Sequence, residues 1–421
     1  MVVGTAIQRL GSTPSPKDVM QYMEALGLQH KVVGTSIQGR DLVLYQFPRP
    51  SSQRRQKNKN KQAHEWDEEE YEQDHRNVPT VLFLSLVHGN EPMGLISLLT
   101  TAHILAEGST RLRTRRGAAA ADDDEAVVRL LFFPIVNIDG YVRNLDCAAG
   151  NHRGNMRVTS CETTSSSRGG YRCSADKAIP PVGVDLNRNF PMDWNGTYSN
   201  SLGEEESNAD ACSMNYRGEA PFSEPETRAI QQVVTDYNVV AAMSFHSLRS
   251  KARRKALLIH PYTSMRPFQD MPAEHAAKFR AWAKALNANG LYKVGTAKEA
   301  IEYTAGGTTI DWLYGAHNVT AFVFEVVPVC DNRWCPATPR LYRSARDYGN
   351  IGRRLVELVV HGKVVQDVDS IQRSIGFLLF LLIVWIMWTW KMPLTSFLRR
   401  RLYGKFKDVS LSEAEMQNLK N

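Results

Sequence analysis

Short apolar runs alternate along the chain with longer segments in which apolar residues recur every three or four positions. The apolar runs predict buried strands, and the amphipathic segments predict helices. We expect strands within residues 32–47, 78–87, 127–136, 239–245, 256–259 and 320–324, and helices at 15–26, 92–105, 225–237, 271–288 and 339–360. This alternation predicts an α/β domain with a mixed, mostly parallel central sheet that is covered by helices on both faces.

Three polar stretches interrupt the alternation, at residues 49–77, 108–126 and 192–215. Polar segments with little apolar content do not bury enough surface to offset the entropy of ordering, so disordered insertions are expected there. With these insertions set aside, residues 14–361 are predicted to form a single domain. Within it, Ser223 and Glu226 have the spacing of a capping box at the start of a helix.

An uncharged apolar segment, IGFLLFLLIVWIMWTW, occupies residues 375–390. Its length predicts a transmembrane helix that follows a linker at 362–374; a buried C-terminal helix is the alternative. Basic residues are frequent in the tail at 391–421, so the positive-inside rule predicts a cytoplasmic tail and a lumenal or extracellular domain. The first 13 residues do not have the apolar core of a signal peptide, so a lumenal or extracellular domain is expected to have further residues before those given, and a tail-anchored protein facing the cytosol is the alternative.

The chain has 421 residues and a formal net charge of +7. The basic residues cluster in the first insertion and in the tail, and no nucleic-acid-binding motif accompanies them, so no nucleic-acid partner is expected. Six cysteines without a CxxC pair are compatible either with disulfides in an oxidising compartment or with free cytosolic thiols.

The turn His88-Gly89-Asn90-Glu91 lies between a buried strand and a helix that begins at Pro92. Proline suits the first helical position and keeps the residue before it out of the helical conformation, so both His88 and Glu91 are expected in the turn. An imidazole and a carboxylate at a strand end make half of a metal site. A surface turn with an incidental histidine is the alternative.

Two further polar residues end predicted strands, His246 after residues 239–245 and Glu325 after 320–324. In sheets of this kind the chemistry gathers at the C-terminal ends of strands. A catalytic zinc uses three nitrogen or oxygen ligands and keeps one position open for water, and His88, Glu91 and His246 form such a set. Glu325 emerges from an apolar strand and is the candidate general base; a helix cap or a structural ion pair is the alternative.

Eight motif blocks occur along the chain in a fixed order. They are His88-x-x-Glu91, Asn137-x-Asp139-Gly140-Tyr141, Arg153-x-Asn155, Gly183-Val-Asp-Leu-Asn-Arg-Asn-Phe-Pro191, Tyr216-Arg-Gly with Ser223-Glu-Pro-Glu226, Ser244-Phe-His246-Ser247, Tyr303 with Gly306-Gly307 and Asp311-Trp312, and Phe324-Glu325. The same motifs occur in the same order in the zinc metallocarboxypeptidases, that is, in the carboxypeptidase A/B and N/E relatives. The chain resembles this family over roughly residues 15–361.

The resemblance implies a role for each of nine residues. His88, Glu91 and His246 are similar to the ligands of one zinc ion, and Glu325 to the general base. Arg153 resembles the residue that stabilises the oxyanion. Asn187 and Arg188 resemble the pair that binds the C-terminal carboxylate, Tyr303 the tyrosine that closes over the substrate, and Ile310 the residue that sets specificity.

Two features depart from the family pattern. Counting back from Asp311-Trp312 puts Tyr303 at the family tyrosine, whereas counting back from Gly306-Gly307 puts Glu302 there, and we choose Tyr303. Ile310 and Thr263 occupy the specificity positions, and neither supplies the carboxylate that a buried C-terminal Lys or Arg would need. We therefore expect an apolar or broad C-terminal preference.

The expected function is zinc-dependent removal of C-terminal residues from peptides or proteins with a free C-terminus. A deglutamylase-like or acyl-amino-acid hydrolase of the same fold is an alternative, with Arg253-Arg254-Lys255 as the candidate basic loop. Alternatives of other classes are an inactive, membrane-tethered peptide-binding module and a zinc-stabilised adhesion domain.

Overall fold

The computed structural model describes residues 7, 10–47, 78–115, 128–146, 152–160, 183–196, 198–199, 205–207, 209–248, 255–264, 270–327, 344 and 346–361. The chain divides into two units, residues 1–360 and 361–421, and the first contains almost all of the described residues. The account below concerns this first unit.

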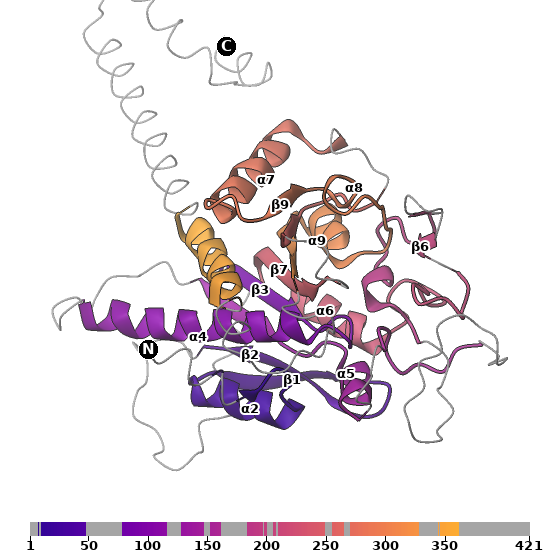
Figure 1. The fold of residues 1–421 in the computed structure, drawn as a ribbon, viewed down its shortest axis with the longest axis horizontal. Coiled ribbons are helices and arrows are strands. Elements are labelled where there is room, and N and C mark those ends of the chain that lie inside the picture. The colour runs from indigo at the N-terminus through magenta and orange to yellow at the C-terminus, as the bar shows by residue number, and fades with distance from the viewer. Residues whose placement is uncertain are drawn as a thin grey trace, which may run out of the picture. The chain divides into compact units, whose positions relative to one another are not determined.

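A mixed sheet of eight strands forms the centre of the first unit (Figure 1). The strand order is β1-β2-β4-β3-β7-β10-β8-β9, and the four inner strands β4, β3, β7 and β10 are all parallel. Antiparallel pairs join β1 to β2, β2 to β4 and β10 to β8. The strands are β1 (Gln29–Thr35), β2 (Asp41–Gln46), β3 (Thr80–Ser85), β4 (Arg129–Phe133), β7 (Val239–Ser247), β8 (Leu257–Ile259), β9 (Lys293–Gly295) and β10 (Thr320–Val326).

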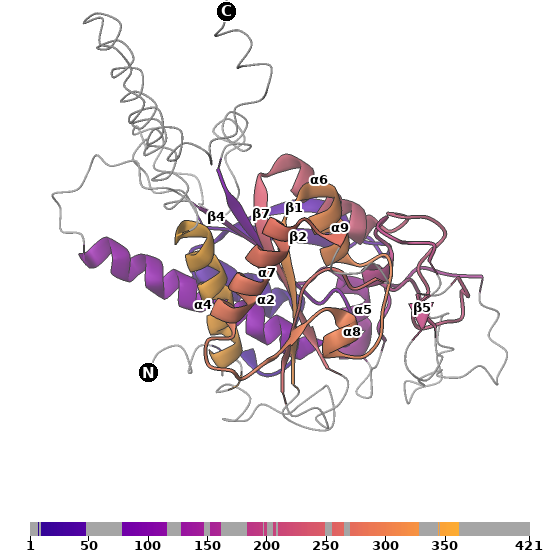
Figure 2. The ribbon, with the colours of Figure 1, turned by 90° about the horizontal axis from the view of Figure 1, so that it is seen from above.

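Alternate residues of the inner strands enter two separate hydrophobic clusters, one on each face of the sheet. Phe83 and Phe245 pack in the first cluster beneath the helices α2, α4 and α7 and residues 346–360, whereas Leu84 and Ala242 pack in the second beneath α6, α8 and α9 (Figure 2). The helices are α2 (Pro16–Ala25), α4 (Pro92–Arg115), α5 (Ile138–Leu145), α6 (Pro225–Asp236), α7 (Ala273–Leu286), α8 (Ala297–Ala300) and α9 (Thr309–His317). Burial on both faces explains why these strands are continuously apolar.

The predicted α/β architecture is confirmed, with local differences. Helix α4 continues to Arg115, ten residues beyond its expected end and into the insertion predicted at 108–126. The stretch 192–215, expected to be disordered, contains an antiparallel pair of short strands, β5 (Tyr198–Ser199) and β6 (Glu205–Ser207). The predicted capping box at α6 is wrong: Glu224 is the N-cap residue and makes no side-chain cap bond, because Arg157 and Asn155 engage its carboxylate, and Glu226 is buried.

Several predicted segments lie outside the described residues. They are the insertion at 49–77, residues 116–126, the linker at 362–374, the apolar segment at 375–390 and the tail at 391–421. Within the described ranges, no helix combines the length and the apolar character that crossing a membrane requires.

Candidate metal centre

The turn between β3 and α4 carries His88 and Glu91, and its path depends on a glycine. A Cβ on Gly89 would lie 2.5 Å from the backbone carbon of Gly140, so no other residue fits without moving the chain. The Gly89 N–H also donates to the carbonyl of Arg153 at 3.0 Å. These contacts fix the turn at the C-terminal end of β3, with His88 and Glu91 both 3% exposed.

His246 reaches the same place from the end of β7, the neighbouring parallel strand. The Ser247 N–H donates to Glu91 Oε2 at 3.1 Å, and the Ser247 hydroxyl accepts from the Gly94 N–H at 3.1 Å. Gly94 permits this approach, since a Cβ there would lie 2.6 Å from the Phe245 carbonyl oxygen. The start of α4 and the end of β7 are therefore joined on either side of Glu91.

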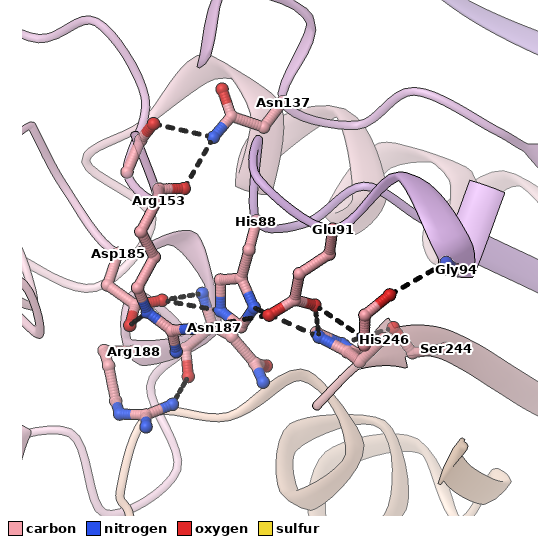
Figure 3. A network of polar contacts seen from close by, with 12 residues as sticks. His88, Glu91, Gly94, Asn137, Arg153, Asp185, Asn187, Arg188, Ser244 and His246 are labelled. Atoms are coloured by element: carbon pink, nitrogen blue, oxygen red, sulfur yellow. Dashed lines mark hydrogen bonds and ion pairs between the residues drawn. The ribbon is translucent and has the colours of Figure 1, made fainter. Parts of the chain in front are cut away.

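The predicted ligand atoms converge (Figure 3). His88 Nδ1 lies 2.9 Å from Glu91 Oε1, His246 Nδ1 lies 2.9 Å from Glu91 Oε2, and the two Nδ1 atoms are 3.1 Å apart. Tetrahedral zinc with bonds of about 2.0–2.1 Å would hold such atoms about 3.3 Å apart. The three groups are the one cluster of metal-ligating side chains found among the described residues.

The outer nitrogen of each imidazole has a partner of its own. His88 Nε2 lies 3.1 Å from Asp185 Oδ1, and His246 Nε2 lies 2.9 Å from the Ser244 hydroxyl. When Nε2 of a neutral imidazole donates outward, its Nδ1 carries no proton. Two lone pairs and a carboxylate then point at one another, an arrangement that a divalent cation satisfies.

The charge of Glu91 suits this role. Burial alone would raise its pKa, but the imidazoles of His88 and His246 outweigh burial and hold the pKa of Glu91 well below its ordinary value. The carboxylate is therefore ionised at neutral pH, as a zinc ligand must be.

Asp185 is a member of the site to which sequence reasoning assigned no role. It is fully buried, accepts from Arg153 Nε at 2.8 Å and from the Asn187 N–H at 3.0 Å, and contacts His88. Burial would raise the pKa of Asp185, but Arg153, His88 and Arg188 hold it well below its usual range. A buried carboxylate that orients a metal-ligating histidine is a common outer-shell partner, and its place between Arg153 and Asn187 in the motif blocks was the available signal.

Arg153 also approaches one of the predicted ligands, with Nη1 3.6 Å from Glu91 Oε1. Burial alone would lower its pKa, but Asp185 and Glu91 outweigh burial and raise it, and an electrostatic interaction with Tyr303 acts in the same direction. Tyr303 is half-buried, whereas Glu302 is exposed and pairs with Lys293 at 3.8 Å. Of the two candidates, Tyr303 is the one with a described interaction with Arg153, and its role in closing over a substrate stays a prediction.

Asn187 and Arg188 lie in a single helical turn, η1 (Leu186–Arg188), next to Asp185. The Asn187 side-chain oxygen accepts from the backbone N–H and the hydroxyl of Thr309, each at 2.9 Å. Arg188 Nη1 donates to the Asn187 carbonyl at 2.9 Å, and Arg188 is 2% exposed. Figure 3 shows Arg188 bonded to Asn187, in the segment that also carries Asp185.

Glu325 and Ile310 complete the predicted set. Glu325 on β10 pairs in register with His246 on the parallel strand β7, so the two side chains leave the same face at the same end of the sheet. Ile310 is 1% exposed in the second hydrophobic cluster. Thr263 is also buried, with its hydroxyl within hydrogen-bond distance of Thr308 and Asp311.

Known proteins with similar sequences are carboxypeptidases. Carboxypeptidase A5 of Macaca fascicularis is 32% identical over 158 residues, which cover 36% of this chain and 33% of that protein. A metallocarboxypeptidase A-like protein of Trichophyton verrucosum is 28% identical over 257 residues, 59% of this chain and 50% of that protein. The chain thus spans between a third and a half of the length of these relatives.

The fold also has solved counterparts. The crystal structure of carboxypeptidase A from Helicoverpa armigera superimposes with a TM-score of 0.54 at 19% identity, covering 81% of this chain and 73% of that chain. A family model for the zinc carboxypeptidases, peptidase family M14, matches residues 20–347. The chain therefore belongs to the zinc carboxypeptidase family.

Proposed function

We propose that this protein is a zinc-dependent metallocarboxypeptidase that removes the C-terminal residue of peptides or proteins. The observation that carries the proposal is that the ligand atoms of His88, Glu91 and His246 lie within 4.8 Å of one another. In addition, the Nε2 atom of each imidazole has a hydrogen-bond partner, Asp185 or Ser244. A zinc ion bound by these three ligands would lower the pKa of a water molecule and polarise the substrate carbonyl.

In this mechanism Glu325 is the general base. It accepts a proton from the attacking water and then returns that proton to the nitrogen of the departing C-terminal residue. Its register beside His246 and its half-buried position support this role. Arg153, held by Asp185, donates to the oxygen that becomes negative in the transition state.

Asn187 and Arg188 account for the restriction to chain ends. A guanidinium can bind a carboxylate through two parallel hydrogen bonds, which both orients the substrate and excludes internal peptide bonds. The bonds from Thr309 to the oxygen of the Asn187 side chain direct its NH₂ group the other way, where it can donate to the same carboxylate. Tyr303, on the Arg153 side of the site, closes over the bound residue.

We further propose an apolar or broad preference for the C-terminal side chain. Ile310 is apolar, and the Thr263 hydroxyl is engaged internally, so neither specificity position offers a counter-charge to Lys or Arg. A deglutamylase would use the basic loop at 253–255. In that loop Lys255 is exposed, and Arg253 and Arg254 lie outside the described residues. Comparing peptides that end in Phe, Lys and Glu distinguishes these specificities.

The membrane anchor at 375–390 and a lumenal or extracellular domain are also part of the proposal. Cys212 is disulfide-bonded, which supports an oxidising compartment. Digestion with a glycosidase should reduce the mass of the full-length protein, because Asn195 and Asn318 lie in glycosylation sequons. An unchanged mass, with disulfides absent from the protein as isolated, would favour the cytosolic orientation.

The activity is tested with the full-length protein and a peptide that ends in Phe. Hydrolysis should stop on addition of a chelator and return with zinc, and Glu325→Gln should lower kcat by about 10²–10⁴. Glu274→Gln is the matched control, because that side chain is 84% exposed on α7. Activity that survives the chelator, or a Glu325→Gln protein with the kcat of the control, would overturn the mechanism.

A further inference from the structure

Three carboxylates lie in the interior beside the segment that carries Arg153. Asp139 on α5, Glu224 at the N-cap of α6 and Glu226 in the first turn of α6 are each 0% exposed. We call them the acidic cluster. None of the three is a predicted zinc ligand, and the proposed mechanism uses none of them.

Two arginines neutralise two members of the acidic cluster. Arg40 Nη1 lies 2.6 Å from Asp139 Oδ1, and Arg157 Nε lies 2.7 Å from Glu224 Oε2. Glu226 has no arginine partner of this kind among the described residues: its Oε2 accepts a 3.2 Å bond from the Asn155 amide, and its Oε1 is buried without a hydrogen bond. A buried, ionised oxygen without a donor is costly, so the geometry favours a protonated Glu226.

The electrostatics of the cluster agree with this geometry. Burial raises the pKa of Glu226 to about 7, and the charges of Glu224 and Asp139 also raise it, against bonds from the Asn155 amide and from its own backbone. Since Arg157 and Arg40 are engaged by Glu224 and Asp139, they offer Glu226 little compensation. Glu226 therefore changes its charge near neutral pH.

Asn155 connects the acidic cluster to the catalytic arginine. Its amide donates to Glu224 Oε2 at 2.6 Å as well as to Glu226. Its backbone N–H donates to the Val184 carbonyl at 3.0 Å, and its side-chain oxygen accepts from the Val184 N–H at 3.1 Å. Asn155 thus bonds the segment that begins at Arg153 to Val184, the residue before Asp185. Asp185 in turn accepts a hydrogen bond from the Arg153 guanidinium.

We propose that Glu226, in its protonated form, is a positioning residue for Arg153 and acts through Asn155. Loss of the Glu226 proton to solvent places a second negative charge beside Glu224. The two carboxylates then repel each other and compete for the Asn155 amide. Asn155 therefore moves, and Arg153 and Asp185 lose their alignment with each other. The effect of this misalignment on kcat rests on the proposed peptidase activity.

The kinetic test compares pH profiles of the zinc-loaded, full-length protein and Glu226→Gln. In the wild type, kcat should fall about tenfold as the pH rises from 6 to 8.5, with little change in KM, because Arg153 acts on the transition state. Glu226→Gln keeps the neutral form at every pH and should retain the kcat of the wild type at pH 6 without this fall. Glu357→Gln, an exposed carboxylate paired with Arg353, is the matched control and should follow the wild type.

A second measurement does not depend on activity. In protein labelled with ¹⁵N-arginine, the Nε resonance of Arg153, assigned with Arg153→Lys, should shift with a midpoint near pH 7 in the wild type and in Glu357→Gln, but not in Glu226→Gln. Superimposable kcat profiles of wild type and Glu226→Gln, or an Arg153 resonance that is flat from pH 6 to 8 in the wild type, would overturn the proposal. An inactive wild type whose resonance still titrates would refute the proposed activity and leave the positioning role standing.

Discussion

Replacing Glu226 with glutamine should change how the stability of the protein depends on pH. The pKa of Glu226 is about 7 in the folded protein and takes its ordinary value, 4.5, in the unfolded chain. Between these values the folded state holds a proton that the unfolded state has released. The contribution of Glu226 to stability is therefore greatest below pH 4.5 and is lost as the pH rises through 7.

The size of the effect follows from the two pKa values. At about 1.4 kcal/mol for each pH unit, the full loss is about 3.5 kcal/mol, of which about 2.5 kcal/mol falls between pH 5 and pH 8. Glu226 is 0% exposed, so solvent screening does not reduce this figure. Glutamine does not titrate, and the variant should lack this contribution.

The assay is chemical denaturation of both proteins at several pH values, with and without zinc. Other groups titrate equally in the two proteins, so the informative quantity is the difference between their free energies of unfolding. We expect the variant to gain about 2.5 kcal/mol on the wild type from pH 5 to pH 8. A difference that stays constant across this range would refute the assignment of a buried, protonated Glu226.

Three further substitutions test the metal centre and its surroundings. Asp185→Asn should weaken zinc binding by about 10–100-fold, measured by competition with a chelating dye, because the variant loses the charged partner of His88 Nε2. Arg188→Lys should lower kcat/KM for a peptide acid by about 10–100-fold, because lysine cannot form the two parallel bonds to the carboxylate. Gly89→Ala should weaken zinc binding by displacing His88, because the added Cβ meets the Gly140 backbone at 2.5 Å.

Two of these substitutions have a control, and Asp185→Asn has a refuting outcome. Gly108→Ala, where no atom lies within 4 Å of an added Cβ, should bind zinc like the wild type. Zinc affinity within twofold of the wild type in Asp185→Asn would contradict the outer-shell role of that carboxylate. A peptide amide in place of the acid should already be a poor substrate, and Arg188→Lys should not lower its turnover much further; an equal loss on both would contradict carboxylate binding.

The sequence predicted the parts of the site that depend on local pattern. His88 and Glu91 could be placed in one turn because Pro92 marks the start of the helix, and His246 and Glu325 could be placed because each ends an apolar strand. Parallel pairing of those strands then brings their ends together. These predictions needed only the order of the elements and the direction of the strands.

The missed features depend on contacts between distant segments. Asp185 bonds to residues 97 and 32 positions away, so no local pattern reveals its role. Glu226 has the spacing of a capping residue, yet it turns inward to Asn155, 71 positions away. The α4 helix continues past its expected end at 105, because a helix can extend beyond the apolar face from which its end was predicted.

The bonds that join β7 to the start of α4 also bear on how the protein acquires its metal. Glu91 is held by the Ser247 N–H, and Gly94 is held by the Ser247 hydroxyl, through interactions that the protein makes by itself. These bonds join the segment that carries Glu91 to the segment that carries His246 through contacts within the protein. Because these contacts do not involve the metal, removal of zinc by a chelator should abolish the proposed activity without unfolding the protein.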